Sequence, residues 1–168
     1  MKKEGVVWIS TILYTMISLA IIGLLLSVIQ PKISQVRDSI IIDQTKASLT
    51  KIDAIVLDVT GGTNSKQYSE FRLGKGNIII SGPNNSISWV YDAKYKYSEV
   101  NRTIRYASSI YETTDQIGDM YRITLKLNYS DIDLRYNDRE IDKILQAGSI
   151  PYKLWFENKD TYIDVTVE

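Results

Sequence analysis

An uncharged apolar stretch near the beginning of the chain constrains this protein most. No charged side chain occurs from Val6 to Ile29, which is 24 consecutive positions, and only the segment Met1-Lys2-Lys3-Glu4-Gly5 precedes it. A helix needs about 20 apolar residues to cross a bilayer. A cleavable secretory signal has a shorter apolar core of about 7–15 residues that ends at an Ala-x-Ala-like site, and no such site occurs before Pro31. The stretch therefore predicts a transmembrane helix over residues 6–30.

The flanking charges predict how this helix is oriented. Lys2 and Lys3 favour a cytoplasmic N-terminus, although Lys32 and Arg37 on the other flank weaken the bias. We therefore expect the rest of the chain to lie outside the cell.

A helical pattern continues past Pro31 as an amphipathic segment over residues 31–60. Apolar residues recur there at helical spacings, with one gap of nine, at Ile33, Val36, Ile40, Leu49, Ile52, Val56 and Val59. The pair Gly61-Gly62 is typical of a helix end. Read as one element, the helix has about 54 residues and a length of about 80 Å. Proline removes a backbone hydrogen bond, so Pro31 predicts a kink or, alternatively, a break between two helices.

Residues 61–168 show the period of two that is typical of strands, so we expect a β-rich globular domain. The expected strands are 67–73, 77–81, 86–92, 102–106, 120–129, 132–136, 151–157 and 161–167. Gly74-Lys75-Gly76 predicts a hairpin between the first two, and residues 139–146 suggest a short helix. The predicted fold class is α+β, with a long N-terminal helix followed by an antiparallel β-sheet or β-sandwich.

Composition argues against several classes of function. Twenty basic and twenty acidic residues give a formal net charge of zero, so the basic surface of a nucleic-acid-binding protein is not expected. The chain has no His and no Cys, so it lacks the commonest general base, the commonest metal ligand and the best nucleophile. We expect no enzyme, no cofactor and no metal.

One acidic cluster raises the alternative of a calcium site. Its members are Asp131, Asp133, Asn137, Asp138, Glu140 and Asp142. An EF-hand loop fails here because Tyr136 stands where glycine is needed and Asp142 where a bidentate Glu is needed. A solvated turn is the simpler interpretation.

The segment Glu4-Gly5-Val6-Val7, placed directly before the apolar stretch, resembles the class III signal of archaeal type IV pilins and archaellins. In that family a membrane peptidase cuts after the glycine. The resemblance covers the leader and the long helix, and it implies that residues 1–5, with Lys2, Lys3 and Glu4, are removed between Gly5 and Val6. The apolar helix would then stay on the mature protein.

The resemblance also implies a function. Before assembly the helix would lie in the cell membrane, and afterwards it would form the core of an extracellular filament, alone or with co-assembling pilins. A heterologous contact that does not close grows such a filament. Bacterial type IV pilins carry a glutamate at the fifth mature position, which is Ser10 here, so assembly would depend on apolar packing. The alternative is a single-pass membrane anchor whose surface domain binds a partner without polymerising.

Three Asn-x-Ser/Thr motifs fall in the predicted exterior domain, beginning at Asn84, Asn101 and Asn128. In an exported protein such motifs are candidate N-glycosylation sites. Glycans on the surface would agree with an archaeal filament. The sequence does not indicate which of the three would be occupied.

Overall fold

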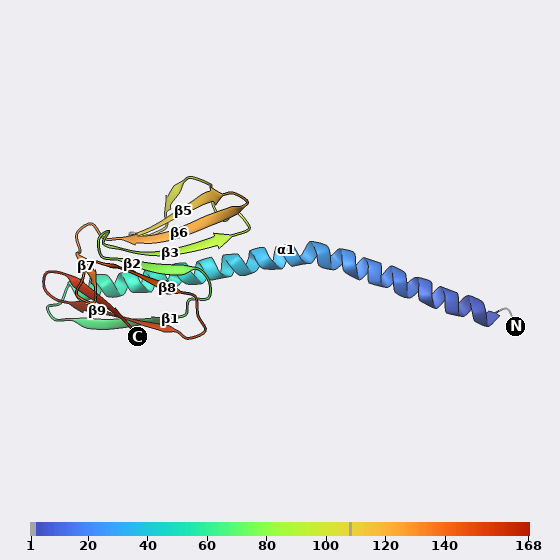
Figure 1. Ribbon diagram of the computed structural model, residues 1–168, viewed down its shortest axis with the longest axis horizontal. Coiled ribbons are helices and arrows are strands. Elements are labelled where there is room, and N and C mark those ends of the chain that lie inside the picture. Colours follow the sequence, from blue (N-terminus) through green and yellow to red (C-terminus); the bar gives the residue numbers. More distant parts are fainter. Residues whose placement is uncertain (1–2, 108) are drawn as a thin grey trace. The chain divides into compact units, whose positions relative to one another are not determined.

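The computed structural model describes residues 3–107 and 109–168, with side chains from Trp8 onward (Figure 1). In this part of the chain one helix, α1 (Lys3–Thr60), precedes ten strands. The strands are β1 (Lys66–Phe71), β2 (Asn77–Ser81), β3 (Ser86–Ala93), β4 (Thr103–Arg105), β5 (Ile110–Ile117), β6 (Met120–Asn128), β7 (Leu134–Tyr136), β8 (Asp142–Gln146), β9 (Tyr152–Asn158) and β10 (Ile163–Val167). The predicted α+β class, with a long N-terminal helix, is confirmed.

The chain divides into two compact units, Met1–Asp38 and Ser39–Glu168. The second unit is called the domain below. It contains the last part of α1 as well as the strands, because residues 39–60 carry the helix side chains that enter the hydrophobic core.

Helix α1 continues through Pro31 and ends at Thr60. The alternative of two separate helices is therefore wrong, whereas the kink stays a prediction. The helix end is where the Gly61-Gly62 pair predicted it. There the side-chain amide of Asn158, at the end of β9, donates hydrogen bonds to the carbonyl oxygens of Val59 (3.1 Å) and Gly62 (3.0 Å). Carbonyl groups at a helix end lack partners within the helix, so Asn158 ties this end to the sheet.

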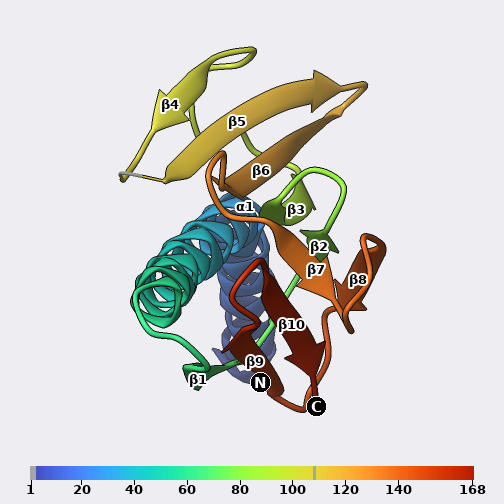
Figure 2. The same ribbon diagram turned by 90° about the vertical axis from the view of Figure 1, so that its left-hand side faces the viewer.

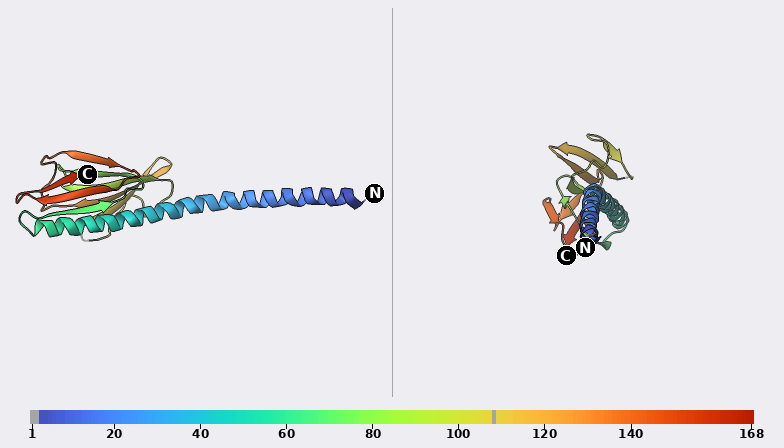
Figure 3. Two further views of the ribbon diagram at one scale, coloured as in Figure 1. Left: turned by 90° about the horizontal axis from the view of Figure 1, so that it is seen from below. Right: turned by 90° about the vertical axis from the view of Figure 1, so that its right-hand side faces the viewer.

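The strands form two sheets. One has the order β1-β9-β10-β7 and the other β4-β5-β6-β3-β2-β8. Neighbouring strands are antiparallel, except that β10 and β7 are parallel. Figure 2 shows residues 39–60 of α1 beside both sheets, and the buried side chains of all three form one hydrophobic cluster. Figure 3 shows that the strands run broadly along this part of the helix.

The buried face of the helix differs from the predicted one. Leu49, Ile52, Val56 and Val59 are buried as expected, but Ile33, Val36 and Ile40 are exposed. The reason lies in the gap of nine residues in the apolar pattern, between Ile40 and Leu49. Ile42 is 1% exposed whereas Ile40 is 49% exposed, and Lys46 occupies the buried face one turn after Ile42.

Two predictions about the sheets are wrong, and one strand was missed. Residues 67–73 and 77–81 do not form a hairpin, because β1 pairs with β9 and β2 pairs with β3 and β8. Residues 139–146 hold no helix, since β8 adds to the edge of β2 and buries Leu145. Strand β5 was not predicted at all. Its inward positions include the polar residues Glu112 and Thr114, so the apolar alternation that signals a strand is absent.

Candidate membrane and assembly site

The apolar segment of α1 leaves its large side chains uncovered. Trp8 is 72% exposed, and the Leu, Ile, Val and Met side chains as far as Ile29 are also exposed. This part of α1 has the length and composition of a helix that crosses a membrane. The segment is therefore compatible with membrane anchoring.

Hydroxyl groups within the apolar segment are bonded to their own helix. Thr15 donates a hydrogen bond to the carbonyl oxygen of Ile12 (2.8 Å), and Ser27 donates one to that of Leu24 (2.7 Å). Back-bonding of this kind satisfies a polar group without an external partner. These residues therefore leave the segment apolar toward whatever surrounds it.

The proposed leader lies at the border of the described residues. Met1 and Lys2 fall outside them, and Lys3, Glu4, Gly5 and Val6 belong to α1 by their backbone alone. Cleavage between Gly5 and Val6 stays a prediction. Ser10, at the position that matches the pilin glutamate, is half-buried.

The three glycosylation motifs lie in different surroundings. Asn84, Asn101 and Asn128 are all exposed. The third residue of the first motif, Ser86, is buried, and the Asn84 amide already donates a hydrogen bond to Ser81 (2.9 Å). The motif at Asn101 lies entirely at the surface, in the connection that leads into β4. Access therefore favours Asn101 as a glycan acceptor.

A buried ion pair, which the sequence did not reveal, joins α1 to β5. The Lys46 ammonium lies 2.7 Å from a Glu112 carboxylate oxygen, with the two side chains 9% and 4% exposed. Lys46 also donates a hydrogen bond to the hydroxyl of Tyr97, which in turn donates one to Asp43 (2.8 Å). The rings of Tyr97 and Tyr106 lie 4.7 Å and 4.6 Å from the ammonium, within cation–π range.

Protonation of Lys46 is favoured by its partners. Burial by itself lowers the pKa of Lys46, but the hydrogen bonds to Glu112 and Tyr97 outweigh this and raise the pKa above its ordinary value. A protonated amine is not a nucleophile, so the arrangement is suited to holding α1 against β5 rather than to catalysis. The sequence offers one local signal, because Lys46 follows Ile42 by four residues and precedes Leu49 by three, which places all three on one side of a helix.

A second pair of buried polar side chains, Asp53 on α1 and Tyr129 after β6, lies further along the helix. The hydroxyl of Tyr129 and one carboxylate oxygen of Asp53 are buried and have no hydrogen-bond partner among the described residues. Burial raises the pKa of Tyr129 well above its ordinary value, and the nearby Asp53 carboxylate raises it further. The phenol therefore stays neutral.

The acidic residues of the predicted turn do not gather into a metal site. No group of three His, Cys, Asp or Glu side chains suited to a metal ion occurs in the part of the chain that the structure describes. Asp133 instead pairs with Arg135 at 2.9 Å, and Glu140 lies 3.5 Å from the same guanidinium group.

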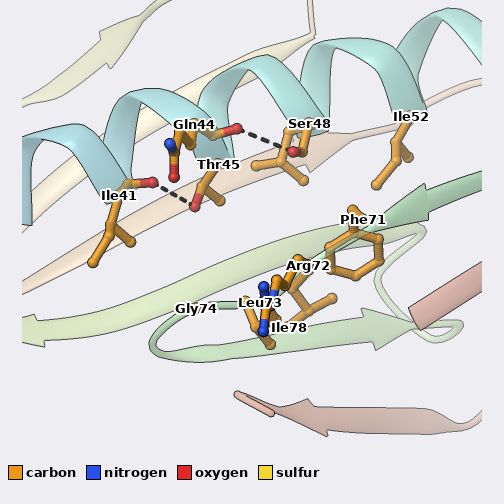
Figure 4. A pocket seen from close by; sticks show the side chains of 11 residues that line it. Ile41, Gln44, Thr45, Ser48, Ile52, Phe71, Arg72, Leu73, Gly74 and Ile78 are labelled. Atoms are coloured by element: carbon orange, nitrogen blue, oxygen red, sulfur yellow. Dashed lines mark hydrogen bonds between the residues drawn. The ribbon is translucent and has the colours of Figure 1, made fainter. Parts of the chain in front are cut away.

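A small apolar pocket lies between α1 and the connection from β1 to β2 (Figure 4). Its volume is about 120 Å³, and Leu49, Leu73 and Ile78 in its lining are buried. The hydroxyls of Thr45 and Ser48 donate hydrogen bonds to helix carbonyl oxygens, as Figure 4 shows. Because its walls are mostly apolar, the pocket can accept a small apolar group.

No protein-family model, no curated protein and no solved structure matches this chain. Its function is therefore argued from its own residues. The apolar segment of α1 is the largest uncovered apolar surface among the described residues, and extended surfaces of this kind mark membrane or protein contacts.

Proposed function

We propose that this chain is a structural subunit of a type IV pilus-like extracellular filament, stored in the cell membrane and assembled through its N-terminal helix. Adhesion, surface attachment or motility would be the work of such a filament. The observation that carries the proposal is the uncovered apolar segment from Trp8 to Ile29, which directly follows Glu4-Gly5-Val6-Val7.

The physical support comes from the cost of exposing this segment to water. Burying one Leu or Ile side chain is worth about 1.5–3 kcal/mol, and α1 exposes more than ten large apolar side chains before Pro31. Lipid covers that surface in a membrane. Outside a membrane, the apolar segments of identical neighbouring helices would cover one another. The same helix could therefore lie in the membrane before assembly and in the filament core afterwards.

The state of the bond between Gly5 and Val6 tests the proposal. In cells that contain an archaeal prepilin peptidase, the mature protein should begin at Val6, as read by intact-mass measurement. Gly5→Val should leave the leader in place and prevent filaments from forming. Gly23→Val is the matched control for cleavage, because Gly23 lies away from the bond between Gly5 and Val6, and this chain should still begin at Val6. A mature chain that keeps residues 1–5 while filaments form normally contradicts the proposal.

Ser10 favours a second candidate, a membrane-anchored surface domain that does not polymerise. It replaces the glutamate that bacterial pilins carry at the matching position, so a polar contact between subunits is missing. This candidate predicts a chain that keeps its leader, remains in the membrane fraction and gives no filaments by electron microscopy.

A further inference from the structure

The domain has two ends, which differ in charge. The proximal end is defined as the end where residues 39–45 of α1 lie, and it carries the connections 72–76, 94–102, 118–119 and 147–151. The distal end, near Thr60, carries the connections 61–65, 82–85, 129–133, 137–141 and 159–162. Figure 1 shows these connections gathered at opposite ends of the strands.

Hydrogen bonds and strand pairing confirm these groupings. At the proximal end Gly148 donates a backbone hydrogen bond to Leu73 (3.2 Å), and Ala93 pairs with Tyr121 beside the turn from β5 to β6. At the distal end Gly82 donates one to Ile141 (3.2 Å), and Ile163 donates one to Asp133 (2.8 Å). Each end is thus a single surface made of several connections.

Basic residues collect at the proximal end. Two connections there, 72–76 and 94–102, hold five basic residues against the one acidic residue Glu99, which pairs with Arg102. The basic residues are Arg72, Lys75, Lys94, Lys96 and Arg102, whereas Asp43, Asp119 and Glu168 lie elsewhere at this end. Apolar side chains are exposed beside them, with Ile150 at 77% and Ile117 and Met120 also exposed. The proximal end therefore carries a basic surface on connections 72–76 and 94–102, with exposed apolar side chains beside it.

The distal end carries the reverse balance. Its connections hold five acidic residues against the two basic residues Arg139 and Lys159, the acidic ones being Asp131, Asp133, Asp138, Glu140 and Asp160. Arg135 on β7 pairs with two of the five, Asp133 and Glu140, and acid remains in excess. Ile141 is exposed among them. The separation of charge disappears in the net charge of zero for the whole chain, which is why composition gave no sign of it.

We propose that the basic proximal end of one copy docks on the acidic distal end of the next copy. The charges are complementary, and complementary surfaces steer association and fix its orientation. Because two different surfaces meet, the contact is heterologous and does not close, so it propagates in one direction. The inference rests on the proposed filament and adds to it: the domains associate end to end, in addition to the packing of the N-terminal helices.

A second copy explains more of the structure than a lipid surface does. An anionic membrane would attract the basic end, but it gives no role to the acidic end or to Ile141. A copy of the same chain uses both ends at once, and the exposed apolar residues on the two ends can contact each other.

Charge-reversed chains test the proposal. Lys94 and Lys96 are exposed at the proximal end, and Asp131 and Glu140 are exposed at the distal end. The chain with Lys94→Glu and Lys96→Glu presents acid at both ends, and the chain with Asp131→Lys and Glu140→Lys presents base at both. Each of these two chains should assemble poorly by itself. Its critical concentration should rise about tenfold, because repulsion replaces several weak ion pairs between neighbouring copies. An equimolar mixture should assemble almost as well as the original chain, because unlike ends then meet.

A matched control separates this effect from charge in general. Lys51 on α1 and Lys126 on β6 belong to none of the connections at either end. Lys51→Glu with Lys126→Glu therefore changes the net charge as much as the Lys94 and Lys96 substitutions do and should leave assembly unchanged. Filaments that form from either reversed chain alone as readily as from the original would overturn the proposal. The lipid alternative is the outcome in which only the Lys94 and Lys96 substitutions matter, and they abolish binding to vesicles of anionic lipid.

Crosslinking keeps this test separate from the test of the filament. The chain has no cysteine, so a Lys96→Cys chain and an Asp131→Cys chain can be mixed in membranes and treated with a short bismaleimide. A heterodimer should form, and it should be absent when Lys51→Cys replaces Lys96→Cys. A heterodimer without filaments would support the end-to-end contact and contradict the filament proposal. Filaments without a heterodimer would support the filament and contradict the end-to-end contact.

Discussion

Removing one member of the buried pair between Lys46 and Glu112 should destabilise the domain more than removing both. The two charged atoms lie 2.7 Å apart and are almost completely buried. Lys46→Met leaves the Glu112 carboxylate buried without its cation, which costs about 3–5 kcal/mol. Glu112→Met leaves the ammonium in the same position. The double variant removes both charges and replaces them with apolar volume, so we expect it to be closer to the original chain than either single variant.

The loss of stability can be measured by thermal unfolding of the full chain in mild detergent, with circular dichroism of the sheets as the readout. At roughly 3–4 °C per kcal/mol for a domain of this size, each single variant should lower Tm by roughly 9–20 °C. Lys51→Met is the control, since Lys51 is exposed on the same helix. Single effects that simply add in the double variant would refute the reasoning, because additivity means that the two charges do not interact.

The same pair predicts a dependence on pH. The pKa of Lys46 is raised in the folded state above its ordinary value of 10.5. A raised folded-state pKa gives stability that is complete below the unfolded pKa and is lost as pH rises through the folded one. Tm should therefore fall in alkaline solution for the original chain, and this loss should be smaller in the double variant. An equal alkaline loss in both would contradict the assignment to Lys46.

Three further predictions concern single positions. Gly76→Ala should lower the free energy of unfolding, measured by denaturant titration, by at least about 2 kcal/mol, because φ is +75° and a Cβ would lie 2.5 Å from a backbone oxygen of β3. Gly118→Ala is the control, since Gly118 also has a positive φ but lies in open space, and it should cost less. Ile52→Ala should cost about 2–5 kcal/mol as a core truncation, whereas Ile40→Ala on the exposed side of α1 should change the midpoint little; equal losses would refute the burial pattern. In a glycosylating archaeal host, Asn101→Gln should remove one glycan mass from the intact protein, and an unchanged mass would show that Asn101 carries no glycan.

Sequence reasoning succeeded where the signal is local. The uncharged stretch, the Gly61-Gly62 end of α1, and strands such as β3, β6, β9 and β10 depend on neighbouring residues alone. It failed where partners far apart in the chain decide. Strand β8 exists because β2 has an edge to pair with, and β5 turns polar side chains inward because Lys46 meets Glu112 there.

The sequence by itself determined that this chain begins with a helix of membrane-spanning length that continues to Thr60 and is followed by strands, because charge, apolar period and glycine act through the nearest residues. Only the tertiary structure decided which face of residues 39–60 is buried, that β1 pairs with β9 instead of β2, and that basic and acidic connections lie at opposite ends of the domain. Those features depend on which segments far apart in the chain come into contact, and patterns of neighbouring residues do not determine those contacts.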